Sequence, residues 1–502
     1  MRGVPSLISD IRKKVFTEVA RMAYNGDDYT KAEDLPFLIV PGDQPLHRES
    51  IFLERAIAGE RVRLAMGLSV RSVQTRSLMT EGMDHAAIAK QYYEPPLINI
   101  IPYACHACPV NRYWVTDVCQ NCLSASCQQV CPREAIKFVN GKSRIDPAKC
   151  IRCGKCAQAC AYHAIVHLER PCQAACGMDA IGSDENGRAT INQEKCVSCG
   201  QCLVSCPFGA IVDKGQIYQV VRSIMEGDKV IAIMAPAFAR QFGKDVTAAK
   251  LSSALRALGF ADVVEVAIGA DICAVEEAKD FLEKVPAKQP FMATSCCPAW
   301  HAMVHKLFPA QAKNISMTLT PMVYTARMVK REQPDARIVF VGPCAAKKLE
   351  AIREDIRSDV DFVLTFEELQ GMFEAKEVDF ESLEEDPKLK NAGTAAGRGF
   401  AVAGGVAQAV VDIIHAQHPD MEIKVANAEG LKDCRKLMTM AKTGKYNGFL
   451  LEGMACPGGC VAGAGTLLPI DQAVKGVETA KKLATRKNPL ESEFSGIAEE
   501  LV

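Results

Sequence analysis

The stretch Glu-Gly-Met-Ala-Cys-Pro-Gly-Gly-Cys, residues 452–460, decides how the rest of this chain is interpreted. It follows the apolar run Gly448–Leu451 and places Cys456 and Cys460 four residues apart on a glycine-rich turn. Thiolates are soft metal ligands, and glycine lets the backbone approach a bulky inorganic group. Taken alone, the pair is compatible with a zinc site, a redox-active cysteine pair or an iron–sulfur cluster.

Cysteine is the residue that sets the composition of this chain apart. The 502 residues contain 23 Cys but only two Trp, and the formal net charge is −1. This length favours roughly two to four domains, and the near-neutral charge favours neither a nucleic-acid nor a membrane partner. The segment from Met1 to Tyr24 is expected to form an amphipathic helix that lacks the apolar core of a signal sequence.

The chain has no window that approaches the roughly 18 uninterrupted apolar residues of a membrane span. We therefore expect a cytoplasmic protein. In that compartment structural disulfides are rare, and clustered cysteines more often bind metal.

The chain divides into three segments of different character. Residues 1–100 contain no Cys and are expected to be a helical packing region, helical to about Thr80. A break is expected near Pro36–Pro45, and a second charged helix over Arg48–Gly67. Residues 101–212 are loop-rich and hold 16 Cys.

From residue 213 onward, apolar runs alternate with helical patterns, which predicts an α/β domain with short strands, parallel in part. The expected strands are Lys229–Ala235, Asp262–Ala267, Pro290–Thr294, Arg337–Gly342, Val360–Thr365, Glu422–Ala426 and Gly448–Leu451. Helices are expected over Ala248–Leu258, Ala274–Lys284 and Thr320–Glu332. Ligands in such sheets sit beyond the carboxyl ends of the strands. Cys297, Cys344 and Cys456 each follow an apolar run, so we expect them to share one site.

The middle segment contains two adjacent cysteine runs of the bacterial two-cluster ferredoxin type. In that pattern the fourth Cys of each run ligates the other cluster, and a zinc site is a poor alternative for this spacing. One run has two extra residues before its third Cys. The runs are Cys119-x2-Cys122-x4-Cys127-x3-Cys131-Pro132 and Cys150-x2-Cys153-x2-Cys156-x3-Cys160. They assign Cys119, Cys122, Cys127 and Cys160 to one cluster, and Cys150, Cys153, Cys156 and Cys131 to the other.

The pattern recurs downstream in incomplete form. The run Cys196-x2-Cys199-x2-Cys202-x3-Cys206-Pro207 is intact, whereas only Cys172-x3-Cys176 remains of its partner. The same swap assigns Cys176, Cys196, Cys199 and Cys202 to a third cluster. Two cysteines of this half then lack partners, and one Cys-x2-Cys pair is unused. We infer a fourth cluster from Cys105, Cys108, Cys172 and Cys206, with a free Cys105/Cys108 pair as the alternative.

Three of the remaining cysteine contexts together resemble the signatures of [FeFe], or iron-only, hydrogenases. They are Thr-Ser-Cys-Cys-Pro-Ala-Trp at 294–300, Gly-Pro-Cys-Ala-Ala-Lys-Lys-Leu-Glu at 342–350, and the stretch at 452–460. The resemblance covers roughly residues 220–465, and the Cys-rich arrangement resembles the monomeric group B branch. It implies an α/β two-lobed catalytic domain over 216–502. Ahead of it we expect the helical segment (1–100) and two ferredoxin-like [4Fe–4S] domains (101–168 and 169–215).

The resemblance also implies the cofactor and the reaction. In the family an H-cluster joins a [4Fe–4S] cluster to a diiron subsite with CO, cyanide and azadithiolate, and it catalyses 2H⁺ + 2e⁻ ⇌ H₂. The matching ligands are Cys297, Cys344, Cys456 and Cys460, with Cys460 as the bridging thiolate. Four accessory [4Fe–4S] clusters would carry electrons.

Further positions match the family's site residues. Cys296, which precedes the ligand Cys297, matches the proton-donating cysteine of the family. This is consistent with its position beside the ligands, because a thiol that passes protons cannot itself be an iron ligand. The other matches are Glu277, Asp280 and Ser316 in the proton relay, Lys347 at a cyanide, Met454 and Met322 near the subsite, Pro236 and Ala237 at the second cyanide, and Phe400 as an apolar wall. Asp280, Ala237, Met322 and the run after Cys460 depart from the residues common in the family. These departures leave the ligands intact.

The resemblance implies ferredoxin or a similar soluble carrier as the electron partner, dedicated hydrogenase maturation proteins, and H₂ and protons as substrates. No glycine-rich dinucleotide fingerprint is present, so NAD is not expected. One alternative is a non-catalytic relative used in iron–sulfur assembly, against which Cys296, Glu277, Lys347 and Met454 argue. Another is an H₂ sensor, although no signalling domain is visible after residue 465.

Overall fold

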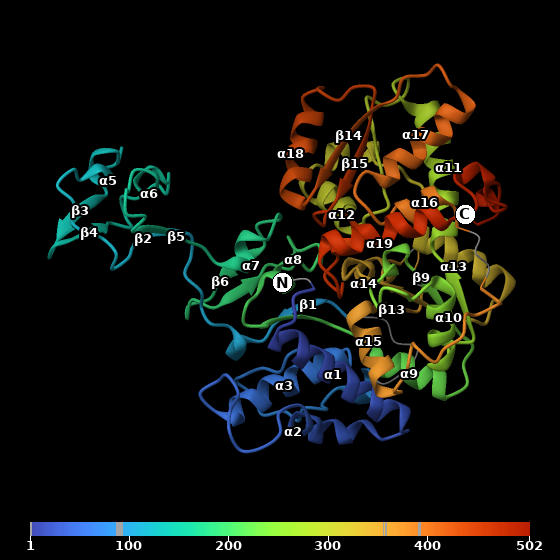
Figure 1. The fold of residues 1–502 in the computed structure, drawn as a ribbon, viewed down its shortest axis with the longest axis horizontal. Helices are drawn as coiled ribbons and strands as arrows, with labels where there is room; N and C mark the ends of the chain where they lie inside the picture. The colour runs from blue at the N-terminus through green and yellow to red at the C-terminus, as the bar shows by residue number, and fades with distance from the viewer. Residues whose placement is uncertain (1–2, 87–93, 355, 357–358, 390–392, 502) are drawn as a thin grey trace.

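The computed structural model describes residues 3–86, 94–354, 356, 359–389 and 393–501. Two separate parallel sheets form the centre of the largest part (Figure 1). One has the strand order β10-β9-β12-β13 and the other the order β11-β15-β14. The strands are β9 (Val230–Met234), β10 (Asp262–Glu265), β11 (Met292–Ala293), β12 (Arg337–Gly342), β13 (Phe362–Thr365), β14 (Lys424–Glu429) and β15 (Phe449–Met454).

All seven apolar runs that the sequence indicated are strands, and every pairing among them is parallel. The strands β9, β12, β13 and β15 are buried almost throughout, because helices cover both faces of a parallel sheet, whereas the edge strand β14 has no buried residue. The helices are α9 (Ile217–Met225), α10 (Ala248–Ala257), α11 (Ala267–Lys284), α12 (Pro298–Leu307), α13 (Pro321–Glu332), α14 (Ala346–Ala351), α15 (Phe366–Ala375), α16 (Ala395–Gly399), α17 (Gly405–Gln417), α18 (Leu431–Lys442) and α19 (Ile470–Leu483). The predicted helix from Ala274 begins earlier, at Ala267.

The cysteine-rich segment folds into short antiparallel hairpins and single helical turns. Strand β2 pairs with β5, β3 with β4, β6 with β7, and β1 with β8. In Figure 1 the elements from β2 to β5 stand apart from the rest of the chain, at the left. The elements are β1 (Ile98–Ile100), β2 (Arg112–Val115), α5 (Ser126–Gln129), β3 (Ile136–Val139), β4 (Lys142–Ile145), α6 (Lys155–Gln158), β5 (Ile165–Leu168), α7 (Pro171–Ala174), β6 (Ile181–Ser183), β7 (Ala189–Ile191), α8 (Gln201–Ser205) and β8 (Ile211–Asp213).

The N-terminal region is less helical than the sequence indicated. Helix α1 begins at Leu7 rather than at Met1, which lies outside the described residues together with Arg2. Pro36 does not break a helix, because it stands in the first turn of α2, where a missing N–H costs nothing. The helices are α1 (Leu7–Tyr24), α2 (Leu35–Ile39), α3 (Ile51–Ala65) and α4 (Met83–Ala86). The chain from residue 66 to Thr80 is turns and irregular structure, so the predicted helix to Thr80 is wrong there.

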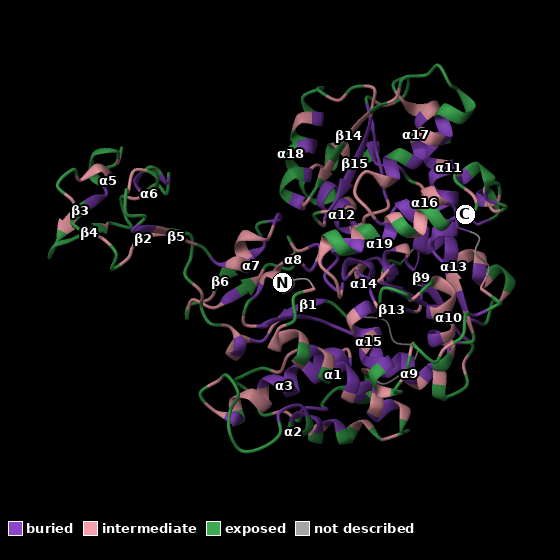
Figure 2. Cartoon of the chain, viewed as in Figure 1, coloured by how far each residue is buried: buried purple, intermediate pink, exposed green. Residues whose placement is uncertain are grey.

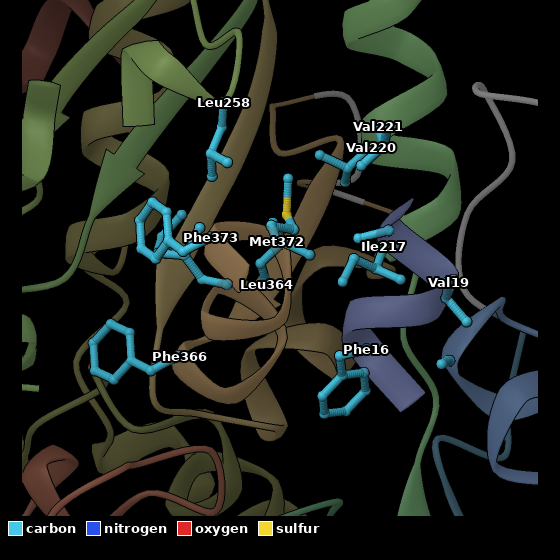
Figure 3. Close-up of a cluster of buried hydrophobic side chains, with 14 of the residues drawn as sticks. Phe16, Val19, Ile217, Val220, Val221, Leu258, Leu364, Phe366, Met372 and Phe373 are labelled. Carbon is cyan, nitrogen blue, oxygen red and sulfur yellow. The ribbon is translucent and has the colours of Figure 1, made fainter. Parts of the chain in front are cut away.

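This region shares a hydrophobic core with the largest part of the chain instead of forming a separate one. Phe16 and Val19 of α1 belong to the same buried cluster as Ile217 of α9 and Phe366 and Met372 of α15. Figure 3 shows these side chains together, and Figure 2 shows α1 and α15 mostly buried where they meet. No helix among the described residues is long and apolar enough to cross a membrane.

A buried charge network joins the three parts of the chain. Lys348 of α14 is fully buried, and its Nζ lies 2.8 Å from Asp213 Oδ2 and 3.1 Å from Glu368 Oε1. Asp213 ends β8 of the cysteine-rich segment, and its other oxygen lies 3.4 Å from Arg12 of α1. Breaking such a network leaves buried charges unpaired, so it fixes how the three parts fit together.

Candidate functional site

Four cysteines that are far apart in the sequence line one cavity of about 80 Å³. Cys297 caps the N-terminus of α12 just after β11, and Cys344 follows the end of β12. Cys456 follows β15, and Cys460 begins the short 3-10 helix at residues 460–462. The carboxyl ends of strands from both sheets therefore meet at this cavity, as expected for ligand sites in α/β folds.

The surroundings of these thiols fit an iron–sulfur cluster. All 23 cysteines are free thiols. The Ala455 N–H donates to Cys297 Sγ at 3.5 Å, and Gln201 Nε2 donates to Cys456 Sγ at 3.2 Å. Hydrogen bonds to ligand sulfurs stabilise thiolate charge and tune cluster potentials. A Cβ on Gly459 would lie 2.5 Å from Ala403 N, so the turn that carries Cys460 closes without room for a side chain.

The remaining cavity wall is largely apolar and includes most of the side chains that the family resemblance indicated. Met322 and Met454 are at most 2% exposed, which keeps water away from this side of the cavity. Lys347 and Cys296 bring a cation and a thiol into the same wall. The predicted residues that line the cavity are Pro236, Ala237, Cys296, Met322, Lys347, Phe400 and Met454.

Lys347 has buried partners on the protein side of the cavity. Its Nζ donates to Glu350 Oε2 at 2.6 Å and to Thr320 Oγ1 at 3.2 Å. Thr320 Oγ1 in turn donates to Glu350 Oε1 at 2.6 Å. Burial lowers the pKa of Lys347, but the charge and hydrogen bond of Glu350 together with the nearby Cys344 and Cys296 outweigh it, so the pKa is raised. The ammonium at the cavity wall is therefore a permanent cation.

Glu277 of α11 is a buried carboxyl with one free oxygen. Its Oε1 accepts a hydrogen bond from the Ser295 N–H at 3.1 Å, whereas its Oε2 has no partner among the described residues. Burial raises the pKa of Glu277 to about 8. Burial also raises the pKa of the neighbouring Cys296 thiol, with the charge of Glu277 adding to the effect. Both groups therefore hold protons near neutral pH.

Ser316 is connected to Glu277 through two residues that sequence reasoning missed. Ser316 Oγ donates to Thr318 Oγ1 at 2.9 Å. Ser295 Oγ donates to the Thr318 carbonyl at 2.9 Å and lies 3.4 Å from Glu277 Oε1. Ser295 stands inside the quoted 294–300 motif, so its polarity and position could have indicated it. Asp280 lies outside this network, because its Oδ2 accepts from Lys284 Nζ at 2.7 Å.

Two of the predicted accessory cysteine sets each gather around one small cavity. Cys131, Cys150, Cys153 and Cys156 line one, and Cys105, Cys108, Cys172 and Cys206 line another. No trio of His, Cys, Asp or Glu side chains in the described part of the chain is placed to hold a single metal ion.

The cysteines of the other two predicted sets are described by the groups that surround them. Cys199 and Cys202 are close enough to Cys176 and Cys196 that charge on these thiols raises their pKa, beyond the larger effect of burial. Cys199 also lines the cavity that Cys297, Cys344, Cys456 and Cys460 share. In the remaining set, Cys127 and Cys160 lie in one apolar cluster, while Cys119 and Cys122 lie in the loop before α5.

Arg170 is a further residue that the sequence did not indicate. Its guanidinium is 2% exposed and donates to the carbonyls of Cys108, Gly182 and Gly187 at 3.0, 2.8 and 2.7 Å. It therefore fixes the loop that carries Cys108 against the β6–β7 hairpin. An isolated Arg in a loop has no motif, because its role depends on carbonyls that are distant in sequence.

Grouped cysteines on ferredoxin-type hairpins beside a thiol-lined cavity define an iron–sulfur redox protein. Comparison with known families refines this class. Residues 228–464 match the family described as iron only hydrogenase large subunit, C-terminal domain. Residues 113–161 match a 4Fe-4S dicluster domain, and residues 189–212 match a 4Fe-4S binding domain.

Individual relatives agree with the family match. Iron hydrogenase 1 of Clostridium pasteurianum is 30% identical over 66% of this chain and 67% of its own length. A probable cytosolic Fe-S cluster assembly factor of Drosophila mojavensis is 26% identical over 54% of this chain and 68% of its own. A structure of HydA(deltaEFG) that reports stepwise [FeFe]-hydrogenase H-cluster assembly covers 54% of this chain and 89% of its own, with 23% identity and a TM-score of 0.46. The chain belongs to the iron-only hydrogenase family.

Proposed function

We propose that this chain is a hydrogenase of the group B type that catalyses 2H⁺ + 2e⁻ ⇌ H₂, with an H-cluster held by Cys297, Cys344, Cys456 and Cys460. The observation that carries the proposal is the half-free, buried Glu277 carboxyl beside the Cys296 thiol at the wall of the four-cysteine cavity. A protein that only held a cluster would have no use for a buried carboxyl with an unpaired oxygen, which costs free energy.

The H-cluster, with its CO, cyanide and azadithiolate groups, would supply an open iron position where protons and electrons combine. Cys296 would hold a proton on Sγ at the cavity wall, and Glu277 would replace it from the protein side. The Lys347 ammonium would donate to an anionic cyanide, since charged donors bind anionic acceptors strongly. Met454, Met322 and Phe400 would exclude water.

Protons would reach Glu277 from the Ser316 side. Ser316 is itself only 4% exposed, but the next residue, Met317, is 80% exposed, so this end of the network lies one residue from the molecular surface. The network is not a continuous hydroxyl chain, because Ser295 Oγ donates to a carbonyl. A proton transfer from Thr318 to Glu277 therefore requires the Ser295 hydroxyl to turn, or a water molecule to bridge.

Electrons would travel through four accessory [4Fe–4S] clusters held by the predicted cysteine sets. Cys199 lines the proposed catalytic cavity, and Gln201, the first residue of α8, donates a hydrogen bond to Cys456. Both contacts support the third set as the accessory cluster nearest to the H-cluster. Cys202 and Cys172 interact electrostatically, which supports the Cys105/Cys108/Cys172/Cys206 cluster as the next. Ferredoxin or a similar soluble carrier would exchange electrons with the two-cluster part.

Infrared spectroscopy of the protein, expressed with hydrogenase maturation proteins, tests this proposal. We expect CO and CN⁻ bands, together with H₂ production from reduced methyl viologen. The diiron part aside, the iron content should be about 20, from five [4Fe–4S] clusters. Absence of the CO and CN⁻ bands would contradict the hydrogenase assignment, and about 16 irons would remove one accessory cluster.

A role in iron–sulfur assembly is the second candidate, because a probable assembly factor is among the relatives. That role requires cluster cysteines but neither Cys296 nor the free oxygen of Glu277. If the matured protein contains [4Fe–4S] clusters, lacks the infrared bands and releases iron–sulfur clusters to an apo-acceptor, the second candidate replaces the first.

A further inference from the structure

Arg61 of helix α3 is a buried cation in a region of the chain to which the proposed function gives no chemistry. Its side chain is 7% exposed, and its Nη2 donates to the Gly209 carbonyl at 3.0 Å. Its Nε is buried and has no partner among the described residues. An unpaired donor on a buried guanidinium is costly, so the position requires a compensating group.

Arg61 has no carboxylate partner within the described part of the chain, unlike other buried cations nearby. Arg12 pairs with Asp213 and Glu367, and Arg71 pairs with Glu60. The charged groups that act on Arg61 are Arg12 and Arg48, which repel it, and Cys206, which attracts it. Burial and the two arginines lower the pKa of Arg61 to about 10, so it remains a cation at neutral pH.

The loop contacts of Arg61 place it beside one predicted cluster. Gly209 is three residues beyond Cys206, and its N–H donates to the Cys206 carbonyl at 3.3 Å. A Cβ on Gly209 would lie 2.9 Å from Arg61 Nη2, so the guanidinium is pressed against this loop. Cys206 in turn lines the small cavity that it shares with Cys105, Cys108 and Cys172.

We propose that Arg61 is a second counter-charge of the Cys105/Cys108/Cys172/Cys206 cluster, in addition to Arg170 at the cavity wall, and raises the reduction potential of this cluster. The inference rests on the proposed fourth cluster. A [4Fe–4S] core with four thiolates is an anion that becomes more negative on reduction. A buried cation beside it therefore favours the reduced form, because Coulomb interactions are strong at low dielectric. The N-terminal helical region then acts in electron transfer by setting the potential of one cluster.

An alternative counter-charge is a solvent anion. A cavity of about 430 Å³ lies against Arg61 and is also lined by Lys14, Arg48 and His106. The two sources of negative charge are distinguishable. A cluster bound to its cysteines is unaffected by exchange of buffer anions, whereas a phosphate-filled cavity would respond to replacement of phosphate by chloride.

The test is a redox titration of the full-length protein followed by electron paramagnetic resonance, with iron content measured on each sample. Cys206→Ala identifies the signal of this cluster by its loss. In Arg61→Gln we expect that signal to titrate at lower potential, with its reduction equilibrium constant reduced tenfold or more. This corresponds to about 59 mV for one electron. Arg61→Lys keeps the charge and should retain most of the wild-type potential.

Arg55→Gln is the matched control. Arg55 lies on the same helix, but its guanidinium binds the carbonyls of Val40 and Gly42, so no cluster potential should move. An unchanged potential in Arg61→Gln at full iron content overturns the proposal, as does a shift seen only in phosphate buffer. About 16 irons in the wild type would instead refute the fourth cluster itself. If Arg61→Gln loses its iron, the test rests on Arg61→Lys, which keeps the positive charge. A changed cluster potential in Arg61→Lys would then contradict the proposed charge effect.

Discussion

Two buried glutamates, Glu452 and Glu277, differ in how many of their carboxylate oxygens have hydrogen-bond partners. Glu452 accepts the Gly404 N–H at 2.7 Å and the Ala407 N–H at 2.8 Å, one on each oxygen. It therefore holds the N-terminus of α17, where anions are favoured. Glu277 binds with one oxygen and leaves the other free. Only Glu277 can exchange a proton without breaking a structural contact.

Replacing Glu277 with Gln should lower H₂ production by about 10²- to 10⁴-fold, the contribution expected of a positioned proton donor. The amide fills the same space but cannot pass a proton. Activity with reduced methyl viologen measures the effect. Glu276→Gln is the control, since Glu276 pairs with Lys279 outside this network. Equal losses in both variants would mean that Glu277 has no special part in proton transfer.

Stability should also depend on the protonation of Glu277. Burial raises its pKa from 4.5 to about 8 in the folded protein. The folded state then holds a proton that the unfolded chain has lost, so this contribution is complete below pH 4.5 and disappears as pH rises through 8. Within this window each pH unit removes up to about 1.4 kcal/mol. The difference in melting temperature between Glu277→Gln and the wild type should therefore be more favourable to the variant at pH 8 than at pH 5.5. The same offset at both pH values would contradict the raised pKa.

Cys296→Ala should abolish turnover and leave the iron content unchanged, because Cys296 is assigned to proton transfer and its neighbour Cys297 to iron. Iron analysis and the viologen assay measure the two effects separately. Cys434→Ala is the control, since Cys434 is fully buried and donates to the carbonyls of Ala428 and Met454. Loss of iron in Cys296→Ala would mean that ligand and proton donor have been confused.

The cysteine sets were proposed from the sequence because cluster ligands follow fixed local spacings, and their role as ligands stays a prediction. The structure gathers Cys105, Cys108, Cys172 and Cys206 at one cavity, although their grouping was inferred only from the count. A side chain that acts through backbone distant in sequence, such as Arg170, leaves no local pattern. Arg61 was hidden for the same reason, since its environment is made by a loop 148 residues away.

At the scale of elements, strands were more predictable than helices. Most of the seven parallel strands contain short apolar runs, because both faces of a parallel sheet are buried; the edge strand β14 is an exception, since it has no buried residue. Helix α3 lies in the predicted charged helix Arg48–Gly67, yet its charged residues Glu60, Arg61 and Arg63 are all buried. Their partners come from other segments, so charge alone did not reveal burial. The sequence likewise gave no sign that α1 packs into the core of the catalytic part.

The contact between α14, β8 and α15 should depend strongly on Lys348. Lys348→Met removes the cation between Asp213 and Glu368, which leaves two buried carboxylates without their common partner. We expect a loss of about 3–5 kcal/mol of folding free energy, measured as a lower midpoint of urea unfolding. Lys13→Met is the control, because the exposed Lys13–Glu374 pair should contribute at most about 1 kcal/mol. Similar midpoints for the two variants would show that the network is not stabilising.

At the scale of the whole molecule, charge is distributed unevenly. The part from residue 112 to 168 has eight Lys or Arg and three Asp or Glu, a net charge of +5, while the whole chain has −1. The rest of the chain is therefore acidic, at −6. Bound clusters add about −2 each, which leaves this part near neutral and makes the remainder more acidic. An acidic electron carrier would be repelled by the main body and directed to the two-cluster part.

Cys153 marks where such a carrier would approach. It is the only cysteine of the 23 that is classed as exposed, and it lies at a predicted cluster between the exposed residues Ile151, Arg152 and Lys155. Arg133 and Arg152 both line the cavity of this cluster. The basic side chains would attract the carrier, and Ile151, 58% exposed, would offer an apolar contact next to the ligand.

Electron transfer from a reduced, acidic ferredoxin should therefore slow with rising salt and with charge reversal here. In Arg133→Glu/Arg152→Glu we expect the second-order rate constant to fall at least about tenfold at low salt, because steering raises association rates by 10- to 10³-fold. Stopped-flow bleaching of the accessory clusters measures this step without requiring H₂ turnover. Lys244→Glu/Lys475→Glu makes the same change in net charge on the main body and should have a much smaller effect. If the two double variants slow the reaction equally, total charge rather than this surface governs the encounter, and the carrier does not enter through the Cys153 cluster.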